Sequence, residues 1–481
     1  MALSRREFFR RAGLLAAGSV LAPRFWRNPW MPKALAQSAG ERFFVVLFLD
    51  GGNDGLNTVV PLDDAIGNST KLRSHYEAAR NTGAGGLRLG QSFLSPMFLG
   101  NDPNTGTPLA FHAALSGLKN LFDRGKVAVV QGCGYPDYSL SHDTSRTIWQ
   151  TGDPAGVGLG GGWVGRYLAG SYGPTDIPAV NVRDQIAKEF FTTRTSVLAF
   201  RRLRNFGFPQ DSWDPSDDEF RRAKLVELAS EATSSQDGSL GFAGNMTQAT
   251  FEASQSYPPL HDLYRADRGS WDDAYRGLGT STARDLLEVA KIVYGVATGQ
   301  PGVSARLFEV RNGGFDTHSN QGGEETEGTH SRLLREVGDA LELFQADLED
   351  MGVADRVVTL VWSEFSRRIR QNDNGTDHGS QGPVFLVGAP VRGGIYGNHP
   401  NIGKLDGRGN TPYWQGPLSD DPADDFRSTD FRDVYGTTLK HWFGLSDVEI
   451  LGSENTPGLL RLDVGDPNFF WTQPNFDLPF L

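Results

Sequence analysis

Residues 357–382 read VVTLVWSEFSRRIRQNDNGTDHGSQG, and this stretch decides how we interpret the fold. Its first six residues are almost all apolar and too few for a helix, which is typical of a strand buried on both faces of a parallel sheet. In open sheets of this kind, functional residues gather at the carboxyl ends of the strands. Here Glu364 follows the strand end, and the pair Asp377-His378 comes later, between glycines.

The pair Asp377-His378 combines a carboxylate oxygen with an imidazole nitrogen. This ligand set suits divalent Zn, Mn or Fe better than Ca, which prefers shells made of oxygen alone. The alternative is that the pair only caps a helix or faces water, as most such dipeptides in loops do. The dipeptide therefore indicates a metal site only if other ligands join it.

Length and composition limit the class of protein. The chain has 481 residues and a formal net charge of −12. It is long enough for one large α/β domain with insertions or for two domains, and it lacks the positive charge expected for binding nucleic acid or anionic membranes. Cys133 is the only cysteine, which excludes an internal disulfide and any C-x-x-C metal motif. Any metal must therefore be held by His, Asp and Glu side chains.

The first forty residues have the features of an export signal. Arg5 and Arg6 precede a mild apolar stretch at 12–22 that is too short to span a bilayer, and the sequence ALA at 34–36 has the pattern of a signal-peptidase site. This arrangement resembles a bacterial twin-arginine signal, which a receptor recognises for export of folded proteins. The alternative is a basic amphipathic start without a role in export.

From this pattern we expect residues 1–36 to be a signal peptide read by the twin-arginine export machinery. Residues 37–481 would then form one domain in the periplasm or outside the cell, with no integral membrane segment in the mature chain.

Three further apolar runs also end in polar residues. They are the runs at 43–49, 127–130 and 307–310, and the residues that follow them are Asp50 and Asp54, Ser141 and His142, and Asp316 and His318, respectively. In an extended segment, residues two apart point to the same side, so Asp316 and His318 can reach one ion. The alternatives are that Asp50 caps an ordinary strand-to-helix turn and that His142 is a helix cap that only packs.

The rest of the chain predicts helices around this sheet. Apolar residues at helical spacing indicate helices at 111–124, 286–296, 330–351 and 433–445. Residues 62–108 are rich in Asn, Gly, Ser and Asp, and we expect an insertion with little regular structure; residues 205–280 are expected to form a helical insertion or cover. The acidic run at 420–425 is interpreted as a solvated surface, or alternatively as a calcium site.

Because the carboxyl ends of strands in a doubly wound sheet meet at one edge, we expect the polar residues at the strand ends to form one cluster. Its candidate metal ligands are Asp50, Asp54, Asp316, His318, Glu364, Asp377 and His378.

Several motifs of the sequence resemble those of the bacterial domain-of-unknown-function 1501 family. Its members are twin-arginine-exported proteins of the alkaline phosphatase/sulfatase-like superfamily. The matching motifs are LDGGNDGLNTVVPL, VAVVQGCGYPDYSLSHDTSRTIWQTG, GGFDTHSNQ, WSEFSRR, GTDHGSQGPVFLVGAPVRGGIYG and DFRDVYGTTLKHWFGL. The resemblance implies an α/β, alkaline-phosphatase-like fold, in which a central, mostly parallel sheet is sandwiched by helices and carries insertions.

The resemblance also implies a two-metal site, held here by Asp50, Asp316, His318, Asp377 and His378. Matching the run WQTG at 149–152 to the W-x-T-G of alkaline phosphatases places the nucleophile position on His142, next to Ser141. We therefore expect these two residues to be catalytic. Two features depart from the superfamily pattern: the closer spacing within Asp-Thr-His, and Glu364 at the strand end.

We therefore expect an exported hydrolase of phosphate or sulfate esters that depends on divalent metal ions (Zn, Mn, Fe, Mg or Ca), with a small-molecule or polysaccharide ester as substrate. Two alternatives stay open. One is a non-catalytic scaffold of the same fold that acts as a cell-surface or polysaccharide-binding protein. The other is an all-oxygen calcium site on Asn372, Asn374 and Asp377.

Overall fold

The computed structural model describes most of the chain after the expected export signal. The described residues are 42–65, 70–135, 138–153, 161–208, 214–235, 237–324, 328–403, 428–453, 456–460 and 474–481. The expected signal peptide and the acidic run at 420–425 lie outside them.

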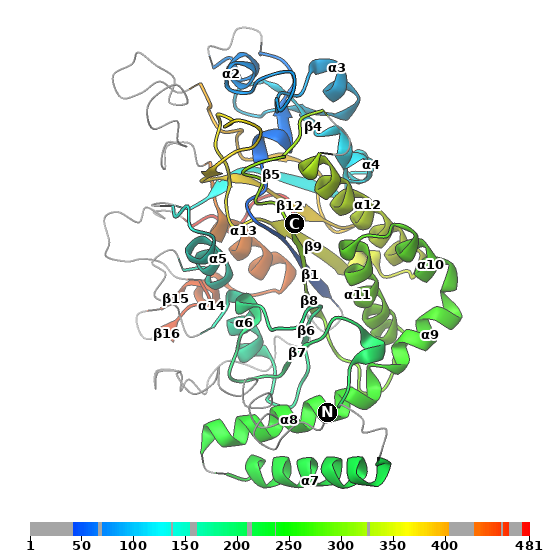
Figure 1. The fold of residues 1–481 in the computed structure, drawn as a ribbon. Helices are drawn as coiled ribbons and strands as arrows, with labels where there is room; N and C mark the ends of the chain where they lie inside the picture. The colour runs from blue at the N-terminus through cyan, green and yellow to red at the C-terminus, as the bar shows by residue number, and fades with distance from the viewer. Residues whose placement is uncertain are drawn as a thin grey trace.

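A nine-stranded sheet runs through the centre of the described residues (Figure 1). Its strands lie in the order β13-β5-β12-β9-β1-β8-β6-β7, with β14 also paired to β5. β12 is antiparallel to its neighbours β5 and β9, whereas the other pairs are parallel. The bounds are β1 Phe43–Asp50, β5 Val127–Gly134, β6 Ala179–Asn181, β7 Val197–Ala199, β8 Leu307–Gly313, β9 Val357–Trp362, β12 Gly382–Val387, β13 Gly394–Tyr396 and β14 Thr429–Asp430.

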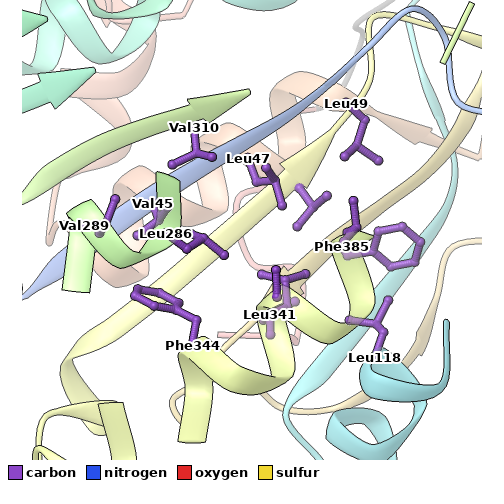
Figure 2. Close-up of a cluster of buried hydrophobic side chains, with 14 of the residues drawn as sticks. Val45, Leu47, Leu49, Leu118, Leu286, Val289, Val310, Leu341, Phe344 and Phe385 are labelled. Atoms are coloured by element: carbon purple, nitrogen blue, oxygen red, sulfur yellow. The ribbon is translucent and has the colours of Figure 1, made fainter. Parts of the chain in front are cut away.

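The central strand β1 is buried along all eight of its residues, because helices cover both faces of the sheet. Alternate side chains enter opposite layers. Val45, Leu47 and Leu49 pack in one hydrophobic cluster, part of which Figure 2 shows, while Phe44 and Phe48 pack in the other. An unbroken apolar sequence is therefore what this position requires.

Two groups of helices form the outer layers (Figure 1). Their buried faces supply the two hydrophobic clusters. One layer contains α4 (Ser116–Asp123), α11 (Ser281–Ala297) and α12 (Thr329–Asp350), and the other contains α5 (His142–Thr151), α6 (Trp163–Ser171) and α13 (Phe431–Thr437), which continues as a π-helical turn at Thr438–Trp442 and is followed by α14 (Asp447–Leu451). The expectation of a mixed α/β fold with a large, mostly parallel sheet flanked by helices is confirmed.

The expectation of little regular structure at 62–108 is wrong. This segment contains α2 (Leu72–Ala79), α3 (Gln91–Leu94), β3 (Phe98–Asn101) and the start of β4 (Pro108–Phe111), and β3 and β4 form a small antiparallel sheet with β2 (Val59–Pro61). The elements are short and separated by turns, so their periodicity is too brief to detect in the sequence.

The described residues of the segment expected to form a helical insertion or cover include α7 (Pro215–Thr233), α8 (Gly238–Ser256), α9 (Pro259–Asp267) and α10 (Gly269–Gly277). Two further short strand pairs are β10 (Ser366–Arg367) with β11 (His378–Gly379), and β15 (Gly452–Ser453) with β16 (Thr456–Pro457). No described helix is both long enough and apolar enough to cross a membrane.

Candidate metal centre

The loops that follow β1, β8 and β9 meet because these three strands are neighbours in the sheet. The fully buried side chain of Arg367 holds the loops together. Its guanidinium donates hydrogen bonds to the carbonyl oxygens of Gly52 at 2.8 Å, Phe315 at 3.0 Å and Thr376 at 2.9 Å. One arginine thus satisfies backbone acceptors from three loops that are distant in the sequence.

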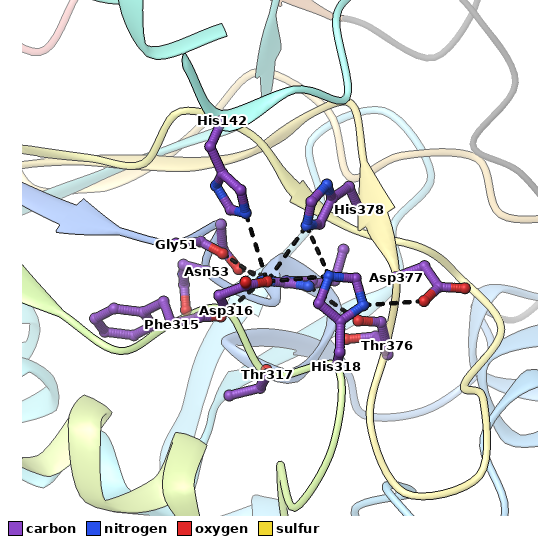
Figure 3. A network of polar contacts seen from close by, with 12 residues as sticks. Gly51, Asn53, His142, Phe315, Asp316, Thr317, His318, Thr376, Asp377 and His378 are labelled. Atoms are coloured by element: carbon purple, nitrogen blue, oxygen red, sulfur yellow. Dashed lines mark hydrogen bonds and ion pairs between the residues drawn. The ribbon is translucent and has the colours of Figure 1, made fainter. Parts of the chain in front are cut away.

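The carboxylate of Asp316 lies at the centre of a histidine cluster (Figure 3). Its Oδ1 atom is 3.1 Å from Nε2 of His318, 3.3 Å from Nε2 of His378 and 3.5 Å from Nε2 of His142. One donor atom each from His142, Asp316 and His378 lie within 4.8 Å of one another, which is the arrangement expected of residues that share a metal ion.

The other ring nitrogen of each histidine, Nδ1, is within hydrogen-bond distance of an oxygen atom. Nδ1 of His142 is 2.8 Å from Oε1 of Glu364, Nδ1 of His318 is 3.1 Å from Oδ1 of Asp377, and Nδ1 of His378 is 2.6 Å from the carbonyl oxygen of Leu140. Because ionised carboxylates and carbonyls only accept hydrogen bonds, a neutral ring satisfies each of these partners when its hydrogen is on Nδ1. In that tautomer, three Nε2 lone pairs face Asp316 and are open to a cation.

This donor set fits a divalent cation. Histidines that bind metal usually donate their second ring N–H to a carboxylate or a backbone carbonyl, as all three do here. Nε2 of His142 is also buried without a hydrogen-bond partner among the described residues. Three imidazole nitrogens with one carboxylate oxygen favour Zn, Mn or Fe over Mg and Ca.

The charges around the cluster keep Asp316 ionised. Burial alone would raise its pKa, but the guanidinium of Arg367, 2.6 Å away, outweighs that effect, and the pKa is lowered to about 2. The hydrogen bond to Glu364 raises the pKa of His142, whereas burial lowers the pKa of His378. A neutral His378 next to an ionised Asp316 is the protonation state that a cation needs.

Glu364, expected as a ligand, contacts Nδ1 of His142, the ring nitrogen that faces away from Asp316. Its buried carboxylate accepts hydrogen bonds from the backbone N–H groups of Gly51 at 3.0 Å and Gly52 at 3.2 Å as well as from His142. The residue that ends the β9 stretch therefore orients a histidine and fixes the turn after β1.

Asp50 and Asp54, also expected as ligands, pair with arginines. Oδ1 of Asp50 is 2.5 Å from the guanidinium of Arg146, and its Oδ2 contacts Arg311. Asp54 is completely buried and accepts two hydrogen bonds from Arg80, at 2.7 and 3.1 Å. Among the described residues, the structure does not bring either carboxylate into the histidine cluster.

Comparison with known proteins places the chain in a family. The family model described as "Protein of unknown function (DUF1501)" matches residues 129–410, more than half of the chain. The chain belongs to this family. The matched residues of this DUF1501 protein include the entire histidine cluster and exclude Asp50 and Asp54.

No curated protein matches this DUF1501 protein. One similar solved structure is the PsFucS1 sulfatase from Pseudoalteromonas sp., with 10% sequence identity over 94% of this chain and 74% of that chain, and a TM-score of 0.34. A likeness of that size assigns neither a fold nor a function.

The two residues expected to be catalytic in this DUF1501 protein have different surroundings. His142 is the first residue of α5 and joins the cluster. Ser141, the N-cap of α5, is exposed, and its side chain makes no capping hydrogen bond. Its hydroxyl is therefore next to the cluster in sequence and open to solvent.

Sequence reasoning missed the arginines of the site. Arg146 lies one helical turn after His142, on the same face of α5, which is a signal that helical spacing offers. Arg311 lies near the end of β8. Neither arginine was expected, because arginine does not supply a metal ligand.

Proposed function

We propose that this protein is an exported, metal-dependent hydrolase of phosphate or sulfate esters with an alkaline-phosphatase-like fold. The observation that carries this proposal is the convergence of three histidine Nε2 atoms on the ionised carboxylate of Asp316, with each ring held through Nδ1. In this proposal His142, Asp316 and His378 hold the cation, and His318 lies at the edge of the site.

A divalent cation would supply Lewis acidity for cleavage of an ester bond at phosphorus or sulfur. The residues of this chain prepare the site for it. Glu364, Asp377 and the carbonyl of Leu140 keep the three imidazole rings in the tautomer that leaves Nε2 free. Arg367 fixes the position of Asp316 and keeps it charged.

The arginines beside the cluster support an anionic substrate. The side chains of Arg146 and Arg311 are 28% and 39% exposed, so solvent reaches both while Asp50 holds them. Nε of Arg146 is buried and has no hydrogen-bond partner in the part of the chain that the structure describes. Guanidinium groups bind phosphate and sulfate oxygens well, and here they offer local positive charge on a chain whose formal net charge is −12.

We retain Ser141 as the candidate nucleophile, because its exposed hydroxyl immediately precedes a residue of the cluster and makes no capping bond. The substrate would be a small-molecule or polysaccharide ester.

The second candidate is a non-catalytic scaffold. The ion pairs of Asp50 with Arg146 and of Asp54 with Arg80 favour it, because they occupy carboxylates that a second metal ion would require. Such a protein would hold at most one structural cation and bind its partner without chemistry.

The test is metal analysis combined with an activity assay. Protein exported with its own signal should contain close to one equivalent of Zn, Mn or Fe and should hydrolyse p-nitrophenyl phosphate or p-nitrophenyl sulfate. His378→Ala should lose both properties. A native protein that keeps a full equivalent of metal but hydrolyses neither ester would favour the scaffold, and one without stoichiometric metal would refute the metal centre.

A further inference from the structure

The side-chain amide of Gln321 lies behind the metal centre, fully buried, and binds three other side chains. Its Nε2 donates to Oδ2 of Asp54 at 2.5 Å. Its Oε1 accepts from the hydroxyl of Thr376 at 2.7 Å and from that of Thr317 at 3.1 Å. One amide therefore connects the loops after β1, β8 and β9.

The two threonines are immediate neighbours of residues in the cluster. Thr317 lies between Asp316 and His318, and Thr376 lies directly before Asp377. The side chain of Thr317 is buried, whereas those of Asp316 and His318 are 48% and 45% exposed, so an inward Thr317 lies between two residues that face outward to the cation site. The two hydroxyls thus hold, from the buried side, the loop with Asp316 and His318 and the loop with Asp377 and His378. We call these the two ligand loops.

The backbones of these two loops also touch at this level. The N–H of Thr376 donates to the carbonyl oxygen of Thr317 at 3.1 Å. A Cβ atom on Gly375 would come within 2.4 Å of the backbone of His318. Gln321 joins the same two loops through its side-chain amide. Its backbone N–H also donates to the carbonyl oxygen of Asn374 at 3.0 Å.

The ion pair of Asp54 with Arg80 determines which way the amide points. The Asp54 carboxylate accepts both from Arg80 and from Gln321, and burial, which would raise its pKa, is outweighed by Arg80, so the pKa is lowered and the carboxylate stays ionised. An ionised carboxylate accepts hydrogen bonds only, so the NH₂ of Gln321 must face it and Oε1 must face the two hydroxyls. Reversing the amide would lose the hydrogen bond to Asp54 and set two oxygen acceptors against each other.

We propose that Gln321 is a positioning residue of the metal centre: it aligns Asp316, His318 and His378 by holding Thr317 and Thr376 together, and Asp54 with Arg80 fixes its orientation. This inference rests on the proposed function in that the aligned residues hold a cation. It gives Asp54 a role one step away from the cation, through Gln321.

The deciding variant is Gln321→Glu, which keeps the size of the side chain and places an oxygen against the Asp54 carboxylate. Binding of Co²⁺, followed by its visible spectrum, should weaken by about tenfold or more, as for other residues that support metal ligands. The double variant Asp54→Asn with Gln321→Glu restores a donor facing an acceptor, and it should bind Co²⁺ more tightly than Gln321→Glu alone.

Tyr264→Phe is the matched control. It also removes a 2.5 Å hydrogen bond to a buried carboxylate, that of Asp347, in the helical layer. It should lower the melting temperature without changing the Co²⁺ affinity or spectrum. If Gln321→Glu only lowers the melting temperature in the same way, or if the double variant recovers no affinity, the positioning role is refuted.

A second measurement does not depend on metal uptake or on hydrolysis. Nitrogen correlation spectra of histidine-labelled, cation-free protein report which ring nitrogen carries the hydrogen. In Gln321→Glu, the tautomers of His318 and His378 should become mixed while that of His142, which Glu364 holds separately, stays fixed. Three unchanged rings would overturn the inference. Absence of Co²⁺ binding by the native protein would instead refute the proposed function.

Should Gln321→Glu fail to fold, Thr376→Val removes one hydroxyl from the amide without changing the shape of the side chain. It should shift the Co²⁺ affinity and the His378 ring in the same direction by a smaller amount. Native values for both in a folded Thr376→Val protein would count against the proposal.

Discussion

The Nε2 atoms of His318 and His378 lie 2.8 Å apart, and the Nδ1 atom of each ring is within hydrogen-bond distance of an oxygen acceptor. With the ring hydrogens on Nδ1, two nitrogen lone pairs face each other at hydrogen-bond distance. Such a contact is repulsive until a proton or a cation stands between the two nitrogens. The cluster is therefore built to gain stability when it takes up positive charge.

Addition of Zn²⁺ or Mn²⁺ to chelator-treated protein should raise its melting temperature. A cation at one hundred times its Kd adds about 2.7 kcal/mol to the free energy of unfolding. Differential scanning calorimetry should show the rise in native protein and not in His378→Ala. His441→Ala removes a histidine that pairs with Asp477 at 2.9 Å outside the cluster, and it should respond like native protein. An equal response of His378→Ala would contradict the assignment.

Asp316→Asn should reduce the amount of bound cation more than Asp377→Asn does. Asp316 contacts the Nε2 atoms directly, whereas Asp377, whose side chain is 49% exposed, only accepts the Nδ1–H of His318. We expect Asp316→Asn to lose at least about half an equivalent of bound metal. Asp377→Asn keeps an accepting oxygen, so its affinity should fall by about tenfold or less. Elemental analysis and calorimetric titration measure both, and equal losses would place Asp377 on the cation.

Gly375→Ala should separate the two ligand loops. The added Cβ would lie 2.4 Å from the carbonyl oxygen of Thr317, so the backbone must shift. We expect weaker cation binding and a lower free energy of unfolding, by about 1–3 kcal/mol, which is typical of overpacking. Gly269→Ala is the control, because a Cβ there meets no atom within 4 Å. Urea unfolding and Co²⁺ titration of both variants check this, and native Co²⁺ affinity in Gly375→Ala would be the contrary result.

Cation binding should weaken as the pH falls. The hydrogen bond to Glu364 raises the pKa of His142 above 6.5 in the cation-free protein, so below that raised pKa a proton competes for the ring. One competing proton weakens binding about tenfold per pH unit. Glu364→Gln should move the onset of this loss to lower pH, as Co²⁺ titrations between about pH 5.5 and pH 8 would show.

The same pair has the opposite effect on folding of the cation-free protein. Because the folded pKa of His142 is raised, its stabilisation is fully present below pH 6.5 and is lost as the pH rises through the raised value. A cation-free protein whose unfolding free energy does not fall over that range would contradict the pairing with Glu364.

Replacement of Arg5 and Arg6 by lysine should keep the protein in the cytoplasm. The proposed export signal is read by a receptor that distinguishes arginine from generic positive charge. Cell fractionation of the double variant, with the native chain as control, measures this. Unchanged export would refute the twin-arginine route.

The parts of the fold that the sequence predicted are those specified by continuous local patterns. The runs that became β1 and β9 are entirely buried, as an almost unbroken apolar sequence of strand length indicates. The long apolar stripe expected at 330–351 corresponds to α12. Where elements are shorter, as in α3 or β3, the pattern contains too few repeats to identify them.

The site was predictable only in its location. The carboxyl ends of parallel strands lie at one edge of the sheet in any strand order. The polar residues that follow β8 and β9 were therefore expected to lie together. Ion pairs such as Arg80 with Asp54 and Arg146 with Asp50 join residues 26 and 96 positions apart and leave no periodic trace. Pairing decides whether a carboxylate is a ligand or a counter-ion, and that choice is made by the tertiary structure.

The position of β1 has a consequence for the order of folding. This strand begins at Phe43, yet both of its partners, β8 and β9, are synthesised more than 250 residues later. Until β8 has emerged from the ribosome, this apolar strand has neither neighbour, and until residue 362 has emerged it lacks β9. Contacts of such long range make folding slow. The nascent chain therefore spends most of its synthesis with an unpaired strand near its amino end, which is a natural binding site for a chaperone.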